Sequence, residues 1–97
     1  MDNNTRSAAA GVLKAMAHPL RLGIIELLAD ENMTVTELCA KLDCSQSMMS
    51  QQLKILQAQK LVSARRNGNN KEFSLCNRDF LKLFGCMQKH LLKFFKL

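Results

Sequence analysis

The 97-residue chain is 47% hydrophobic and has a formal net charge of +6, all of it after Lys60, because the residues up to that point hold six basic and six acidic side chains. This length allows one domain with a modest core and excludes a two-domain enzyme with a cleft between its domains. No run approaches the roughly 20 apolar residues of a membrane-spanning helix, and MDNNTRSAAAG lacks the basic-then-apolar order of a secretory signal. We therefore expect a single cytoplasmic domain, residues 1–97, with no membrane partner.

Two helices are predicted in the first third of the chain. Residues 7–16 are rich in alanine and fit a short helix, although Gly11 weakens it by about 1 kcal/mol relative to alanine. Pro19 separates the two helices, because the residue before a proline is pushed out of the helical region and proline suits a first helical turn. The second helix is expected to end at residues 30–32, and its apolar residues recur at helical spacing: Leu20, Ile24, Leu27 and Leu28.

Residues 34–57 predict two helices joined by a short turn. Thr34 or Thr36 can cap the first helix, whose first turn contains Glu37, where the helix dipole favours an anion. Ser45 can cap the second helix after a turn of three or four residues, which is the spacing of a helix-turn-helix. The apolar stripe of this second helix consists of Met49, Leu53 and Leu56, backed by Met48 and Ile55.

The helical spacing of apolar residues ends at Lys60, and residues 61–75 predict a β-hairpin. The segments LVSARR and KEFSL contain β-branched or aromatic residues, and Asn67-Gly68-Asn69-Asn70 separates them. Asn-Gly is the strongest short-range hairpin signal, because both residues tolerate a positive φ. We expect a small hairpin with a polar tip.

A last helix is predicted for residues 77–97, with Asn77 as its cap. It has more phenylalanine than one small domain needs, so its apolar stripe could supply an interface; packing on the protein's own core is the alternative. The stripe consists of Phe80, Leu83, Phe84, Met87, Leu91, Phe94 and Phe95.

A helix-turn-helix followed by a basic hairpin predicts a winged helix, in which the second helix of the pair enters the major groove of DNA. Glutamine can bond adenine, and serine can meet bases or phosphate. The candidate DNA-binding residues opposite the apolar stripe are Gln46, Ser47, Ser50, Gln51 and Lys54. Candidate phosphate contacts at the hairpin are Arg65, Arg66 and Lys71. The alternatives are an ordinary capped helix and a solvated basic strand end.

The chain resembles the ArsR/SmtB family of bacterial winged-helix repressors. The resemblance runs from about Val12 and rests on AMAHPLRLGIIELL with its His-Pro-x-Arg segment, on Leu-x-x-S-Q-x-x-x-S-Q-x-L, on Lys60-Leu61-Val62 and on the Arg/Gly hairpin, all in the family order. It implies an α+β, mostly α, winged helix-turn-helix fold of about five helices with a two-stranded wing. It also implies a homodimer, built from the first and last helices, that binds an imperfect palindrome in double-stranded DNA and leaves it when an inducer binds.

The resemblance also raises the question of a metal inducer. Metal-sensing members use cysteines near the start of the third helix, and Met33, Thr34 and Val35 stand at those positions here. Others use a pattern close to Asp-x-His and His-x-x-Glu on the last helix. This chain matches it at Asp79 and His90, whereas Asn77 is a weak ligand and Lys93 replaces the carboxylate. No cofactor is certain from these residues.

The four cysteines raise the further question of whether the inducer acts on a thiol. In the cytoplasm all four should be reduced: Cys39, Cys44, Cys76 and Cys86. At 100° per residue, Asp79, Cys86 and His90 share one edge of the last helix, so across a two-fold axis they could hold a soft metal, or Cys86 could be an oxidisable thiol. A small buried Cys86 is the alternative. Cys39 and Cys44 flank a turn and are expected to be structural.

No catalytic grouping competes with this interpretation. The sequence has no Gly-rich phosphate loop, no HExxH and no serine or cysteine with histidine at a recognisable spacing, so we do not expect an enzyme. The remaining alternative is a winged-helix protein-interaction module without DNA binding.

Overall fold

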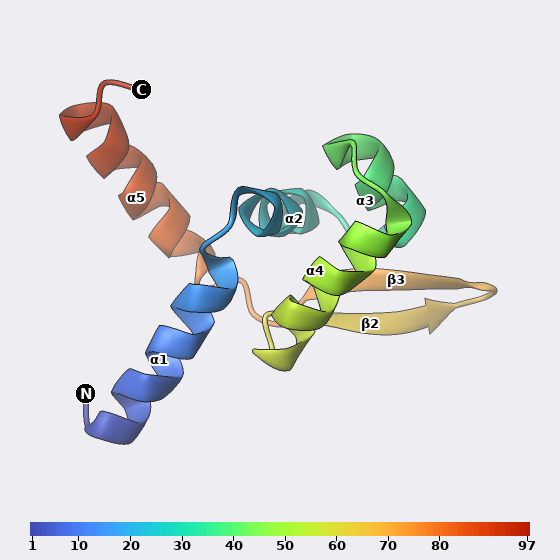
Figure 1. The fold of residues 1–97 in the computed structure, drawn as a ribbon, viewed down its shortest axis with the longest axis horizontal. Helices are drawn as coiled ribbons and strands as arrows, with labels where there is room; N and C mark the ends of the chain where they lie inside the picture. The colour runs from blue at the N-terminus through green and yellow to red at the C-terminus, as the bar shows by residue number, and fades with distance from the viewer.

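The computed structural model describes all residues, 1–97, as five helices and three strands arranged around one core (Figure 1). The helices are α1 (Asn3–Met16), α2 (Pro19–Asp30), α3 (Val35–Leu42), α4 (Gln46–Ala58) and α5 (Leu81–Phe94), and the strands are β1 (Met33–Thr34), β2 (Val62–Asn67) and β3 (Asn70–Leu75). In Figure 1, α1 and α5 extend to one side of the body and the β2–β3 hairpin extends to the other. No helix is long and apolar enough to cross a bilayer. The predicted mostly helical fold with a hairpin is confirmed.

The sheet has one strand more than the sequence predicts. β3 lies in the middle and pairs antiparallel with both neighbours, in the order β1-β3-β2. Phe73 on β3 is opposite Ala64 on β2 and opposite Met33 on β1. The two residues of β1 lie between α2 and α3, so this pairing ties the middle of β3 to the helical body.

Local capping residues set where α1, α3 and α4 begin. α1 starts at Asn3, earlier than predicted, because Asp2 Oδ1 accepts a hydrogen bond from the Thr5 backbone N–H at 2.7 Å. That bond lowers the pKa of the Asp2 carboxyl. Thr34, one of the two predicted candidates, caps α3, and Ser45 caps α4 as predicted. A short polar side chain before each helix therefore fixes its first turn.

The cap at α3 gives a testable difference between two threonines. Thr34 Oγ1 accepts from the Glu37 N–H at 3.2 Å, and Glu37 Oε1 accepts from the Thr34 N–H at 3.0 Å, which is a reciprocal capping box. We expect Thr34→Ala to lower the free energy of unfolding by about 1 kcal/mol, measured by urea denaturation. Thr36→Ala, two residues away at an exposed position, is the control and should change it by less than about 0.5 kcal/mol. Equal effects of the two changes would contradict this assignment.

The start of α5 differs from the sequence prediction. Asn77 does not cap the helix; its Oδ1 accepts from the Asp79 N–H at 2.8 Å and closes a turn instead. The chain then makes i to i−3 hydrogen bonds, such as Leu81 N–H to the Arg78 carbonyl at 3.0 Å, and α5 begins at Leu81 without a side-chain cap. The asparagine satisfied a nearer backbone donor, as asparagine commonly does in turns.

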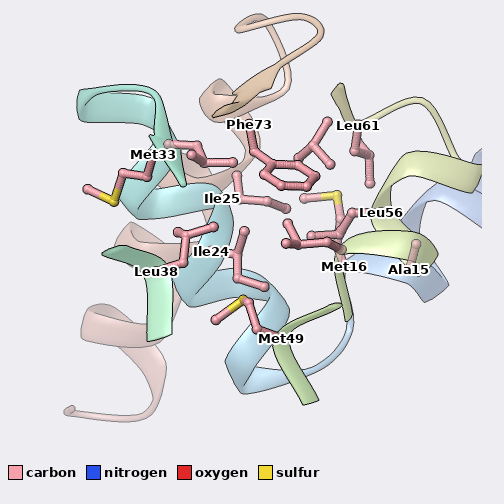
Figure 2. Close-up of a cluster of buried hydrophobic side chains, with 13 residues drawn as sticks. Ala15, Met16, Ile24, Ile25, Met33, Leu38, Met49, Leu56, Leu61 and Phe73 are labelled. Atoms are coloured by element: carbon pink, nitrogen blue, oxygen red, sulfur yellow. The ribbon is translucent and has the colours of Figure 1, made fainter. Parts of the chain in front are cut away.

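The core lies where α2, α3 and α4 meet the sheet (Figure 2). Ile24, Ile25 and Leu28 of α2 are at most 1% exposed. Of the stripe predicted for this helix, Leu20 and Leu27 are only half-buried, whereas Ile25 was not predicted to be buried. The Phe73 ring lies beside Ile25 and faces Leu61, so it joins the sheet to the helices (Figure 2). The cluster has 13 residues: Ala15, Met16, Ile24, Ile25, Leu28, Met33, Leu38, Met49, Leu53, Leu56, Leu61, Val62 and Phe73.

Candidate nucleic-acid interface

The exposed side of α4 has the residue types that the sequence analysis selected. Ser45 Oγ accepts from the Met48 N–H at 3.1 Å and fixes the first turn of the helix. Met49, Leu53 and Leu56 are buried on the other side, which turns five polar side chains outward. These residues, all exposed and referred to below as the polar face of α4, are Gln46, Ser47, Ser50, Gln51 and Lys54. The face offers several neutral hydrogen-bonding groups and one cation, with no carboxylate.

A buried glutamine, Gln52, holds α4 in place, and the sequence analysis did not identify it. Gln52 is 8% exposed and is the one polar residue among the buried ones. Arg21 Nη1 donates to Gln52 Oε1 at 2.6 Å, while Arg21 Nε donates to the Ala15 carbonyl at 2.5 Å. Gln52 Nε2 in turn donates to Met48 Sδ at 3.4 Å. These bonds link α1, α2 and α4. Its burial could have been predicted from the sequence, because at 100° per residue Gln52 falls on the apolar side of α4.

Met48 and Ile55 do not back the apolar stripe of α4, so that prediction is wrong. Met48 is 43% exposed and Ile55 is 39% exposed. Beside Ile55, α1 does not fully cover α4, and Ile55 lines an open groove of about 380 Å³ that also includes Gly11 and Lys14 of α1. The buried stripe of α4 is therefore completed by Gln52 and not by these two apolar residues.

The hairpin divides its three basic residues between the two faces of the sheet. Side chains alternate along a strand, so Arg66 and Lys71, which are opposite each other, lie on the same face as Ala64 and Phe73. Lys71 Nζ lies 5.6 Å from the centre of the Phe73 ring. This face also contacts the helices, and α4 packs against β2. Arg66 and Lys71 therefore extend the basic surface outward from the α4 side of the molecule.

Arg65 lies on the opposite face of the hairpin. Its cross-strand partner is Glu72, whose Oε1 accepts from Asn67 Nδ2 at 2.9 Å. The carboxylate opposite Arg65 offsets part of its charge, whereas Arg66 has a second cation opposite it. All three predicted cations are exposed. Two of them, Arg66 and Lys71, are better placed to attract an anion than the third.

The tip of the hairpin is a two-residue turn, Gly68-Asn69, between the paired Asn67 and Asn70. The positive φ is at Gly68 alone, at +66°, so Asn67 does not adopt the left-handed conformation that its asparagine permits. A single positive φ at the first central residue is the pattern of a type II′ turn. The turn keeps the two strands in register to their ends, which places Arg66 and Lys71 one residue pair from the tip.

Helix α5 leaves most of its apolar stripe uncovered. None of its residues is fully buried. Phe80 and Phe84 are half-buried and pack against the core, whereas Leu83, Met87, Leu91 and Phe94 are 46%, 45%, 36% and 62% exposed. A hollow of about 220 Å³ continues this surface toward α1 and is lined only by Leu13, Met16, Ala17, Leu22, Leu83 and Met87. Packing on the protein's own core therefore does not account for this helix.

The metal and redox candidates are not gathered within one protomer. Asp79 lies in the turn before α5, so the prediction that it shares a helix edge with Cys86 and His90 is wrong. Cys86 and His90 are four residues apart on α5 and both exposed, and the His90 ring lies 4.7 Å from that of Phe94. No group of three or more His, Cys, Asp or Glu side chains could hold a metal ion. At the other family position, Met33 is buried and Thr34 caps α3, so those residues do not fit a metal site.

Comparison with known proteins identifies close relatives of this arrangement. The family model described as bacterial regulatory protein, arsR family, matches residues 18–64. The nodulation protein NolR of Rhizobium meliloti is 44% identical over 79 residues, which is 81% of this chain and 65% of NolR. A transcriptional repressor SmtB homologue of Synechocystis is 37% identical over 82 residues, covering 84% of this chain and 62% of that protein. The chain spans less than two thirds of the length of these two relatives.

Solved structures agree with this comparison. NolR from Sinorhizobium fredii superposes with a TM-score of 0.81 at 37% identity and covers 92% of both chains. Rv0081 of Mycobacterium tuberculosis gives a TM-score of 0.84 at 31% identity, over 99% of this chain and 96% of that one. The homodimeric winged helix-turn-helix DNA-binding domain of Mb0332 from Mycobacterium bovis gives 0.82 at 27% identity, over 96% and 93%. The chain therefore belongs to the ArsR family of bacterial regulatory proteins.

Proposed function

We propose that the chain is a homodimeric transcriptional repressor that reads operator DNA with α4 and grips the phosphate backbone with its hairpin. The observation that carries this proposal is the polar face of α4, an exposed row of glutamine, serine and lysine on a helix whose other side is buried. Glutamine can make two hydrogen bonds to adenine in the major groove, and the start of a helix attracts phosphate. The names of the relatives, a transcriptional repressor among them, support the same conclusion.

The dimer in this proposal uses the exposed apolar surface of α1 and α5. Leu13 on α1 is 56% exposed and lies next to the stripe of α5 through the hollow that they share. Two copies related by a two-fold axis would bury this surface and place two α4 helices for the two halves of a palindrome. The homodimeric form of Mb0332 supports this arrangement. A DNA partner also accords with a cytoplasmic location and with a role other than that of an enzyme.

A double substitution tests the proposed DNA contacts. Gln51→Ala removes a candidate base contact and Arg66→Ala removes a candidate phosphate contact on the α4 side of the hairpin. The probe is a duplex selected by the wild-type protein from a random pool, followed by fluorescence anisotropy at several salt concentrations. We expect at least about a tenfold loss of affinity, because a good bidentate contact contributes roughly 1–3 kcal/mol. The logarithmic salt slope should become shallower by about 0.9 for each protomer.

The matched control is Gln59→Ala with Lys89→Ala, which removes one glutamine and one cation at exposed positions outside the polar face and the hairpin. It should bind the selected duplex as the wild type does. If the wild-type protein selects no sequence, or the Gln51 and Arg66 changes leave affinity unaltered, the chain is instead a protein-interaction module on a winged-helix fold.

An inducer site is a separate part of the proposal. A single protomer brings together only Cys86 and His90 on α5, so a four-coordinate site needs the same pair from the second copy. Two thiolates and two imidazoles suit a soft or borderline metal ion such as Zn²⁺ or Cd²⁺. Lys93, where the family has a carboxylate, argues against an oxygen-rich site.

Removal of the thiol tests this site. If Zn²⁺ or Cd²⁺ releases the wild-type protein from its duplex, Cys86→Ser should abolish the release and leave metal-free DNA affinity unchanged. Anisotropy during metal titration measures both quantities. Cys76→Ser changes another exposed cysteine and should respond as the wild type does. Release of DNA by these metals from the Cys86→Ser variant would overturn the proposed site.

A further inference from the structure

The turn between α3 and α4 brings together two cysteines, Cys39 and Cys44, that the sequence places five residues apart. Asp43 ends α3 in the left-handed conformation, with φ of 51°. The Cys44 backbone N–H then donates to the Cys39 carbonyl at 3.4 Å. A helix that ends in this way folds the chain back, so that the residue after the left-handed one meets the last turn of the helix. The two cysteines are thus adjacent in space at the centre of the helix-turn-helix.

The environment of the two thiols differs from that of the other cysteines. Cys39 and Cys44 are half-buried and pack against the hydrophobic core, whereas Cys76 and Cys86 are exposed. Burial raises the pKa of the Cys39 thiol, and the neighbouring Cys44 thiol raises it further through charge and through a hydrogen bond. The backbone hydrogen bond between the two residues and their shared packing against the core place both thiols at the same end of α3. An apolar contact at this place in a helix end is common, but two alkyl groups would satisfy it equally well.

We propose that Cys39 and Cys44 form a modification site, a dithiol that closes to a reversible disulfide and weakens DNA reading by α4. The oxidant is a hydroperoxide such as hydrogen peroxide. The Cys44 sulfur attacks one peroxide oxygen, which gives a sulfenic acid and releases water. The Cys39 sulfur then displaces the hydroxyl group as a second water, and the two thiol protons end up in the two water molecules. A thiol reductant restores the dithiol.

The position of the bond explains its effect on α4. A disulfide holds its two sulfur atoms about 2.05 Å apart, closer than two thiols in contact, so its formation pulls Cys44 toward α3. Cys44 directly precedes Ser45, whose side chain caps α4, and Gln46 begins the polar face. A shift at Cys44 therefore moves the start of α4 relative to the rest of the body. The predicted effect on DNA rests on the proposed function, whereas formation of the bond does not.

Peptide mapping tests the bond directly. Lys41 lies between the two cysteines, so trypsin cleaves the reduced chain there and separates Leu22–Lys41 from Leu42–Lys54. After treatment of the full-length protein with hydrogen peroxide, mass spectrometry without reductant should find these two peptides joined, at their summed mass less two hydrogens. Cys44→Ser should abolish the joined species, and dithiothreitol should remove it from the wild type. Failure to find the joined peptides would overturn the proposal.

A DNA-binding measurement tests whether the disulfide weakens DNA reading by α4. Peroxide should lower the affinity of the wild-type protein for its selected duplex at least tenfold, and dithiothreitol should restore it. The Cys76→Ala, Cys86→Ala double variant should respond equally, and Cys44→Ser should not respond. A response lost in the double variant, or joined peptides without any loss of affinity, would overturn the proposal. If the reduced protein selects no DNA, the proposed function fails, while the peptide map still decides whether the disulfide forms.

Discussion

Met87→Lys should convert the protein from a dimer to a monomer at micromolar concentration, as measured by sedimentation velocity. Met87 lies in the middle of the α5 stripe, is 45% exposed, and lines the hollow of about 220 Å³ between α1 and α5. Burial of its exposed half contributes about 1 kcal/mol per copy, and a two-fold interface contains two copies. The substitution also leaves an ammonium group without a partner in an apolar interface. We expect the dimer dissociation constant to rise at least about a hundredfold.

Gly85→Lys provides the control for this result. It introduces the same side chain two residues away, on the opposite side of α5, where a Cβ atom would meet nothing within 4 Å. This variant should remain a dimer, and the far-UV circular dichroism of both variants should match the wild type, because neither site is in the core. A dimeric Met87→Lys protein would show that the two copies associate through another surface.

Phe73→Ala should cause a large loss of stability, about 3–5 kcal/mol in the free energy of unfolding. Phe73 is 3% exposed, and its neighbours on both sides belong to other strands, Ala64 on β2 and Met33 on β1. Its removal opens a cavity between the sheet and α2 (Figure 2). Since a domain of this size is stable by only about 5–15 kcal/mol, the change should be plain in urea denaturation followed by circular dichroism.

Ser63→Ala is the control for the sheet. Ser63 is exposed, and its hydroxyl lies 3.4 Å from that of Ser74. Its replacement should cost no more than about 0.5 kcal/mol. Both variants must be compared with the wild type at one protein concentration, because the stability of an associating chain depends on concentration. A cost below about 1 kcal/mol for Phe73→Ala would show that the hairpin is not tied to the helical core.

The features that the sequence predicted correctly are those governed by near neighbours. Ser45 caps α4 because its hydroxyl needs only the N–H three residues on, and the same holds for Thr34 at α3. The buried residues Met49, Leu53 and Leu56 followed from helical spacing alone. The outward direction of the polar face of α4 then followed from the position of this stripe.

The features that the sequence did not predict depend on contacts between distant residues. β1 is two residues long and exists because Met33 meets Phe73, forty positions away. The flank of α4 that holds Ile55 stays open because α1 leaves a groove there. Gln52 is buried because Arg21 reaches it from α2. None of these partners is within one helical turn of the residue that it affects. A local sequence pattern therefore cannot predict these contacts.

The C-terminal helix shows how an error in one predicted helix boundary affects a predicted site. Asn77 was predicted to cap the helix, but its side chain accepts a hydrogen bond from a nearer donor, the Asp79 N–H. The shift of the helix start to Leu81 removed Asp79 from the helix and with it one of three proposed ligands. A change of four residues in one boundary thus altered the chemistry that the helix edge could support, while the apolar stripe kept Leu83, Phe84, Met87, Leu91 and Phe94 within the helix.

Helix α5 has no fully buried residue in a single protomer, where only Leu81 and Phe84 pack against the core, and a 14-residue helix with so little packing is only marginally stable in water. The exposed apolar stripe of α5 would therefore be covered only when two chains meet. While unpaired chains predominate, the amount of paired protein rises with the square of their number, by mass action. If the proposed function holds, the copy number of this protein in the cell would set a threshold, below which its target genes escape control whether or not an inducer is present.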